Sequence, residues 1–387
     1  KQMMLCAVCG NELLEIEKMG KDLPDLLKPF EGRLNPCNEL TFSLQTVNAE
    51  AVKGAFASKG EQSASASSCD CGAGSGSSGR RCLPSKNQAL IMGGAFVDTT
   101  FILDEMPVRG GDSYARVEKI RVGGCAWNVA HVLRILGQRP GGLIPVGDGP
   151  NSELVSARVR KDGYDESSMV IVRDSTYDCA QCMCFVDREG ERTFIAVPGI
   201  ENHMKSSWLQ RIDFTGHKVI YLCGFDLCGD NAMVYAQELA NRMDMDALLF
   251  IDAGARVNHI GKEGFDLLMS LKPMLHLNLM ELEMMSGTKD IAAGLDYLES
   301  LTSRPVVLTL DRYGAMASWE GKFYYFPVTP APVVDATGAG DCHSAGIISR
   351  LMHGENLASA IVFGNQLGGL SIGQYGARLH LPDHFGM

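Results

Sequence analysis

The sequence has no long apolar run and little positive charge. No stretch approaches the ~20 apolar residues needed to cross a bilayer, and no secretory signal pattern opens the chain. Lysine and arginine number 35 against 46 aspartates and glutamates, so the formal net charge is −11. Phosphate backbones bind basic surfaces, so this balance argues against nucleic acid as a partner. We therefore expect a cytoplasmic protein that binds neither membrane nor nucleic acid.

A regular cysteine framework is also missing. The 13 cysteines follow no fixed spacing, and many lie inside apolar stretches, which is typical of buried thiols in a reducing compartment. Cys6 and Cys9 are spaced like half of a zinc knuckle or a redox pair. No second half is found, and no histidine precedes His131, so we expect no metal in this segment.

One segment divides the chain. Residues 58–79 are rich in glycine and serine, which predicts a flexible linker over 58–87. The linker would separate an N-terminal segment of unknown role, residues 1–57, from a large domain over 88–387. On this division, a chain that begins near Ser85 should fold and keep its activity.

Within the large domain, apolar stretches alternate with stretches of helical spacing. The predicted strands are 89–97, 142–146, 218–223, 247–252, 273–277 and 305–310, and the helical stretches include 234–242 and 292–301. Such alternation predicts a three-layer αβα domain with a mostly parallel central sheet. Two further patches, 99–122 and 181–197, favour antiparallel pairing.

The most informative run is 333–346, which reads Val-Val-Asp-Ala-Thr-Gly-Ala-Gly-Asp-Cys-His-Ser-Ala-Gly. A strand end, a glycine turn and a helix start point several unpaired backbone N–H groups and the positive end of a helix dipole at one place, which suits a phosphate. Asp341 beside that place can take a proton from an attacking hydroxyl. Taken alone, Gly-Ala-Gly-Asp at 338–341 also fits an ordinary strand-to-helix turn with an aspartate N-cap.

A second run lies about 200 residues upstream, at 121–130, and reads Arg-Val-Gly-Gly-Cys-Ala-Trp-Asn-Val-Ala. Gly123 and Gly124 allow a ligand to approach the backbone closely, and Asn128 offers both a donor and an acceptor to hydroxyls. A glycine pair before a helix is weak evidence when it stands alone.

Together the two runs resemble the signatures of the ribokinase-like (PfkB) family of carbohydrate kinases, Gly-Gly-x-x-x-Asn-x-Ala and Asp-Thr-x-Gly-Ala-Gly-Asp. Ala336 stands where threonine is usual, and His343 where phenylalanine is common. The resemblance covers residues 88–387 and implies a ribokinase-like fold in which 99–122 and 181–197 form a small β lid. It further implies that Asp341 is the catalytic base. It also implies an anion hole at Gly338, Ala339 and Gly340, and a substrate site at Asp98, Gly123, Gly124 and Asn128. Taken alone, Asp98 is also an ordinary turn residue at a strand end.

Smaller matches follow in the order of the family. Asn-x-x-Glu at 278–281, the strand and turn at 306–314 and the run at 363–377 are similar to its nucleotide and ion segments. The resemblance implies ATP contacts at Asn278, Thr309, Gly314 and Asn365, Mg²⁺ held through water by Glu281, and K⁺ held by Asp335, Thr337, Ser371 and Gly376. Asp311 replaces a family glycine in the nucleotide segment. Gln374 stands where arginine is frequent, and this replacement weakens the K⁺ assignment.

These features predict an ATP-dependent sugar kinase that transfers the γ-phosphoryl group to a hydroxyl, most simply a primary CH₂OH, of a carbohydrate. A nucleoside kinase of the same family is the alternative enzyme, and ADP as phosphoryl donor is less favoured. A non-catalytic protein that senses sugar and nucleotide would keep the pockets, but it has no need of the intact Asp341. The expected partners are a small sugar or nucleoside and, through the lid, a second copy of the chain.

Overall fold

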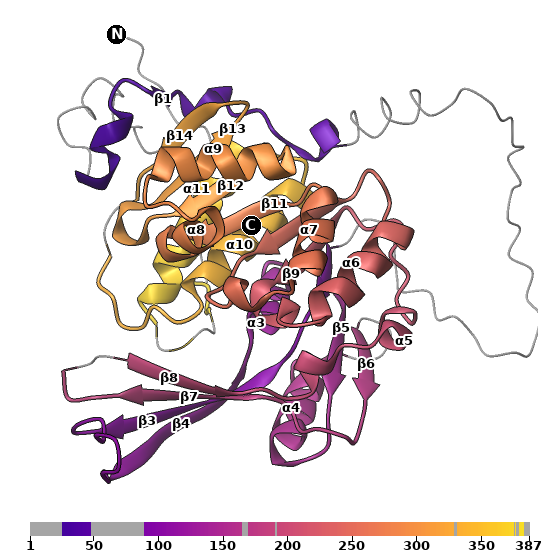
Figure 1. Cartoon of the computed structure of the whole chain (residues 1–387), viewed down its shortest axis with the longest axis vertical. Coiled ribbons are helices and arrows are strands. Elements are labelled where there is room, and N and C mark those ends of the chain that lie inside the picture. Colours follow the sequence, from indigo (N-terminus) through magenta and orange to yellow (C-terminus); the bar gives the residue numbers. More distant parts are fainter. Residues whose placement is uncertain are drawn as a thin grey trace, which may run out of the picture.

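The computed structural model describes residues 25–47, 89–164, 169–189, 192–328, 331–374, 376 and 379–382. It has a large, mostly parallel sheet with helices on both faces, and a smaller sheet extends from one end (Figure 1). The predicted αβα fold with a β lid is confirmed.

The large sheet runs in the order β1 (Leu34–Asn35), β14 (Lys322–Phe326), β13 (Ala315–Trp319), β12 (Val306–Thr309), β11 (Met274–Asn278), β10 (Leu248–Asp252), β9 (Val219–Cys223), β2 (Ala89–Met92), β5 (Gly141–Val146) and β6 (Met169–Arg173). β13 pairs antiparallel with both its neighbours, and all other pairs are parallel. The central strands are apolar and buried because helices cover both faces. The carboxyl ends of the parallel strands therefore share one edge, where open α/β sheets bind ligands.

The helices that cover this sheet are α3 (Cys125–Ile135), α4 (Pro150–Lys161), α5 (Ser206–Leu209), α6 (Asn231–Arg242), α7 (Lys262–Ser270), α8 (Leu279–Ser286), α9 (Ile291–Thr302), α10 (Ala339–Met352) and α11 (Leu357–Ile372). Short 3₁₀ turns lie at η1 (Asp25–Phe30), η2 (Cys37–Glu39), η3 (Ile200–His203), η4 (Gly224–Leu227), η5 (Val257–His259) and η6 (Asp311–Tyr313). α10 and α11 pack closely: a Cβ on Gly346 would lie 2.8 Å from the Cα of Gly364. Both positions therefore need glycine.

The lid is a four-stranded sheet in the order β4 (Ala115–Gly123), β3 (Phe96–Leu103), β7 (Gln181–Val186) and β8 (Arg192–Val197). Its outer pairs are antiparallel as predicted, but the central pair β3–β7, which is joined by a long crossover and not by a hairpin, is parallel. The predicted strand 89–97 is divided in the structure. β2 ends at Met92 in the large sheet, the chain turns at Gly93 with φ 151°, and β3 begins the lid at Phe96.

Residues 25–47 pack on the large domain. β1 adds to the sheet edge beside β14, and the apolar side chains Leu27, Phe30, Leu40, Phe42, Leu44 and Val47 are buried in the same core as the rest of the sheet. The Phe30 ring meets Phe323 edge-on at 5.1 Å, and Phe42 meets Trp319 at 5.2 Å. This part of the N-terminal segment therefore belongs structurally to the domain that the sequence placed at 88–387.

Some of the predictions from the sequence concern residues that the structure does not describe. The linker at 58–87, Cys6 and Cys9 lie outside the described residues. All cysteines within the described ranges are free thiols. In the part of the chain that the structure describes, no helix is long and apolar enough to cross a membrane.

Candidate active site

The turn before α10 has the conformation that a phosphate loop needs. Gly338 is the N-cap with φ 79°, which favours glycine, and no side chain caps the helix. The Ala339 N–H donates to the Ala336 carbonyl at 3.2 Å, so the turn itself uses this amide. An anion would therefore meet the amides of Gly340 and Asp341, in the first turn of the helix.

Asp341 lies in that first turn and is only 7% exposed. Asn128 Nδ2 on α3 donates to its Oδ2 at 2.7 Å, which joins the two signature runs. Burial and the nearby Asp252 raise the pKa of Asp341 to about 6, against the hydrogen bonds from Asn128 and Cys125. A carboxylate with this pKa can accept a proton near neutral pH.

The predicted acceptor residues meet at the base of the lid. β3 and β4 place Asp98 opposite Arg121, and a Cβ on Gly123 would lie 2.1 Å from Asp98 Oδ2. Gly124 has φ 108°, and its Cβ would lie 2.7 Å from the Gly94 carbonyl oxygen. Burial and the charge of Asp341 raise the pKa of Asp98 to about 7. The two glycines thus allow the close packing of β3, β4 and α3 around Asp98.

Asn278 and Glu281 form a reciprocal cap at the start of α8. The Glu281 N–H donates to Asn278 Oδ1 at 2.9 Å, and the Asn278 N–H donates to Glu281 Oε2 at 2.9 Å. Burial and Asp252 raise the pKa of Glu281 to about 7. Asn278 pairs in register with Thr309 on β12, so both lie at the carboxyl edge of the sheet.

Gly314 and Asn365 meet the end of β14. A Cβ on Gly314 would lie 2.1 Å from the Phe326 carbonyl oxygen, and Asn365 Nδ2 donates to that oxygen at 3.1 Å. Asp311, which replaces a family glycine, has φ 52° and so adopts the left-handed conformation that glycine would take.

The predicted K⁺ residues come together only in part. Asp335 accepts from the N–H of Thr337 at 3.0 Å and from the N–H of Gly376 at 2.8 Å, so both carboxylate oxygens are already bonded. The Ser371 hydroxyl instead donates to the Gly368 carbonyl at 2.8 Å. Gln374 closes the loop that follows α11 by exchanging two hydrogen bonds with the backbone of His380. Over the described ranges, no cluster of three or more His, Cys, Asp or Glu side chains could hold a metal.

Sequence reasoning missed Asp252. It ends β10 opposite His276 on β11, and its charge adds to burial in raising the pKa of both Asp341 and Glu281. Its position as the last residue of the predicted strand 247–252, at the ligand-binding edge, was the signal that could have found it.

Asp226 in η4 was also left without a role. Its Oδ1 accepts from the Gly94 N–H at 2.7 Å. Burial raises its pKa to about 8. The carboxyl group thus fixes the turn between β2 and β3, shortly before Asp98, the predicted acceptor residue.

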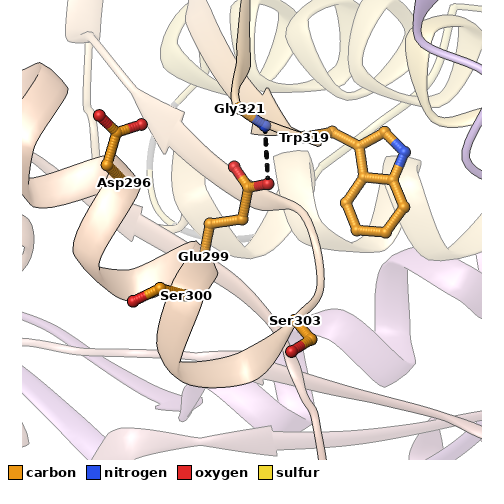
Figure 2. Close-up of a pocket in the computed structure, with 6 residues that line it drawn as sticks. All are labelled: Asp296, Glu299, Ser300, Ser303, Trp319 and Gly321. Carbon is orange, nitrogen blue, oxygen red and sulfur yellow. Dashed lines mark hydrogen bonds between the residues drawn. The ribbon is translucent and has the colours of Figure 1, made fainter.

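A surface hollow lies away from these residues. It is lined by Asp296, Glu299, Ser300, Ser303, Trp319 and Gly321 (Figure 2). Glu299 accepts from the Gly321 N–H at 3.1 Å, which ties α9 to the β13–β14 turn. None of the predicted site residues lines this hollow.

Comparisons with known proteins identify the family to which this chain belongs. The family model described as pfkB family carbohydrate kinase matches residues 93–384. The chain belongs to this family. It is 29% identical over 301 residues to the uncharacterized sugar kinase YegV of Escherichia coli K12, covering 76% of this chain and 91% of that protein.

Two solved structures share the fold. Ribokinase from Giardia lamblia matches with a TM-score of 0.68 at 18% identity, over 76% of this chain and 95% of that one. Arabidopsis thaliana ribokinase complexed with ribose and ATP matches with a TM-score of 0.64 at 18% identity, with the same coverage of each chain. These likenesses confirm the ribokinase-like fold.

Proposed function

We propose that this protein is an ATP-dependent kinase that transfers the γ-phosphoryl group to a primary hydroxyl of a carbohydrate. One observation carries the proposal. The buried carboxylate of Asp341, bonded to Asn128, lies in the first turn of α10, where no side chain caps the helix. A base and an anion site at one place suit phosphoryl transfer to a hydroxyl.

In this reaction the acceptor oxygen attacks the γ-phosphorus and gives its proton to Asp341. The new O–P bond forms as the bond to the β-phosphate oxygen breaks, and ADP leaves with that electron pair. The amides of Gly340 and Asp341 stabilise the charge on the transferred group. Such a transition state requires mainly positioning and electrostatic stabilisation.

Mg²⁺ fits the carboxyl edge of the sheet. Burial and the charge of Asp252 raise the pKa of Glu281, and a divalent cation would relieve the repulsion between the two carboxylates. Glu281 would hold the ion through water, which suits the strong hydration of Mg²⁺. When bound, the ion supplies charge neutralisation at the phosphates. K⁺ has weaker support, because both oxygens of Asp335 are already hydrogen-bonded.

The nucleotide would lie along the same edge, with Asn278 and Thr309 at its phosphate end and Gly314 and Asn365 toward its base. Asp98, Asn128 and the backbone of Gly123 and Gly124 would hold the acceptor, since a carboxylate and an amide match sugar hydroxyls. A nucleoside acceptor presents the same CH₂OH and is the second candidate. The relative named sugar kinase favours a sugar.

We also propose a dimer through the lid and a location in the cytoplasm. Large apolar side chains lie exposed on the two edge strands β4 and β8: Val117, Ile120, Phe194, Ile195 and Val197. Contact with the same strands of a second copy would cover them. Sedimentation of Phe194→Glu beside the unchanged protein tests this, and equal masses would contradict it.

The acceptor class is tested with a panel of sugars and nucleosides in an assay of ADP formation. We expect one or a few sugars to raise ADP formation well above the rate without acceptor. If the protein binds ATP and sugar but no acceptor raises the rate, the sensing alternative replaces the kinase.

A further inference from the structure

A buried chain of hydrogen bonds crosses the domain behind the proposed site. His276 Nε2 lies 2.9 Å from His343 Nδ1, and His343 Nε2 lies 3.1 Å from Asn365 Oδ1. The Asn365 Nδ2 group then donates to the Phe326 carbonyl at 3.1 Å. The chain thus connects β11, α10, α11 and the end of β14 in an unbroken series.

At its other end the chain reaches Asp252. β10 and β11 pair in a register that sets Asp252 opposite His276. The Nδ1 atom of His276 lies 3.2 Å from Oδ1 of Asp252. The Ser344 hydroxyl donates to Asp252 Oδ2 at 2.9 Å and lies 3.1 Å from His276 Nδ1. The series therefore begins at the carboxylate whose charge acts on both Asp341 and Glu281.

The packing around the two rings is tight. His276 and His343 are 2% and 4% exposed, and their ring centroids lie 5.0 Å apart. A Cβ on Gly364 would lie 2.8 Å from the His343 carbonyl oxygen and 3.0 Å from its ring. α11 thus needs glycine here to admit the imidazole.

The fixed carbonyl at one end sets the direction of the two bonds that Asn365 makes. The Phe326 oxygen only accepts, so Asn365 donates to it and accepts with Oδ1 from His343 Nε2–H. Burial and the charge of His276 lower the pKa of His343 to about 3, so its Nδ1 carries no proton and accepts from His276 Nε2–H.

His276 is then protonated at both nitrogens. Its Nδ1 faces an oxygen of Asp252 and the Ser344 hydroxyl, whose own proton points at Asp252. Burial alone would lower the pKa of His276, but the Asp252 carboxylate outweighs it and the pKa is raised. These contacts and the raised pKa both favour the imidazolium form of the ring, with its Nδ1–H toward Asp252.

We propose that His276 and His343 are positioning residues of this kinase, forming a relay that holds Asp252 at the phosphoryl-transfer end and Asn365 at the nucleotide end in fixed orientations. The inference rests on the proposed function for the placement of ATP at Asn365. Neither histidine touches a reacting atom in this role. A phenylalanine at position 343, which is common in the resembled family, cannot make either bond.

The first test uses His343→Phe, which keeps an aromatic ring and leaves Asn365 Oδ1 and His276 Nε2–H without partners. We expect the Kd for ATP to rise roughly five- to tenfold, the scale of one lost hydrogen bond, while the KM for the acceptor stays within about twofold. Asn365→Ala should weaken ATP binding to a similar extent, and the double variant should be no weaker than about the worse single variant. His353→Phe, an exposed site at the end of the same helix, is the matched control and should bind ATP normally.

A second test needs no variant to stay folded. In ¹H–¹⁵N spectra of the full-length protein at pH 7, His276 should carry protons on both ring nitrogens and His343 on Nε2 alone. A proton on His343 Nδ1, or a singly protonated His276, would overturn the relay.

Calorimetry with ATP separates the two proposals. If the unchanged protein does not bind ATP, the proposed function fails and the role of the relay fails with it. If the unchanged protein and His343→Phe bind ATP equally, or if the effects of His343→Phe and Asn365→Ala multiply, the relay alone is overturned.

Discussion

Asn128 on α3 donates a hydrogen bond of 2.7 Å to Asp341 on α10, 213 residues further along the chain. The contact joins the run at 121–130, whose backbone a ligand can approach closely, to the run at 333–346, whose helix start suits a phosphate. It also favours the ionised form of Asp341, against burial and the charge of Asp252, which raise its pKa.

Asp341→Asn tests the proposed base. The amide keeps the size of the carboxyl group but cannot accept the proton, so we expect phosphoryl transfer to fall by ~10²-fold or more while ATP still binds. The measurement is kcat for the best acceptor together with the Kd for ATP. Asp296→Asn, at the hollow of Figure 2, is the matched control and should keep full turnover. Near-normal turnover of Asp341→Asn would remove the base from the mechanism.

The activity should depend on pH through the same carboxyl group. Its pKa is raised from 3.8 to about 6, so kcat/KM should rise with pH through about 6 as Asp341 ionises. The folded state favours the protonated form, so the contribution of this group to stability is full below 3.8 and declines as pH rises through about 6.

Asn128→Ala tests what sets that pKa. Without the hydrogen bond from Asn128, burial and Asp252 act with less opposition, so the acid limb of the pH profile should move to higher pH. The KM for the acceptor should rise as well, because the amide is lost. An unchanged acid limb in a profile measured from pH 5 to 8 would show that another group controls it.

The sequence located the two signature runs because their glycines and acidic residue are required locally. Gly124 and Gly338 have positive φ, and each stands at the start of a helix that periodicity predicts. The boundary between β2 and β3 was missed because the run at 89–97 stays apolar across the turn. β2 joins the large sheet and β3 joins the lid, and the apolar pattern of the run does not show where this change occurs.

The roles of Asp252, His276 and Asn365 could not be read together from the sequence. Their connection depends on strand register between β10 and β11 and on how closely α11 packs on α10. His276 lies inside an apolar strand, where a single polar residue gives no local signal of its partner. Tertiary contacts alone assemble this network.

The effect of monovalent cations should be modest. Asp335 shapes the turn before α10 through the N–H groups of Thr337 and Gly376, so a cation there would act on the geometry of the anion hole and not on the chemistry. We expect slight activation by K⁺ over tetramethylammonium at matched ionic strength. Equal rates in the two salts would exclude a cation from the mechanism. Gln374, which is bonded to the backbone of His380, would then be the support of the loop that follows α11.

The packing of residues 25–47 reverses the expectation that a chain starting near Ser85 would fold well. Phe42 is fully buried against Trp319, and its carbonyl accepts from the Leu357 N–H at 2.7 Å at the start of α11. Truncation would expose this part of the core and one edge of β14, so we expect a less soluble and less stable protein.

Phe42→Ala isolates this contribution in the full-length chain. Removing a buried ring should lower the free energy of unfolding by ~3–5 kcal/mol, measured by urea unfolding. Lys28→Ala, an exposed residue of the same segment, is the control and should change it by less than about 0.5 kcal/mol. Because α11 carries Asn365, the Kd for ATP should also rise in Phe42→Ala. Unfolding midpoints that coincide for Phe42→Ala and the unchanged protein would show that residues 25–47 do not stabilise the domain in solution.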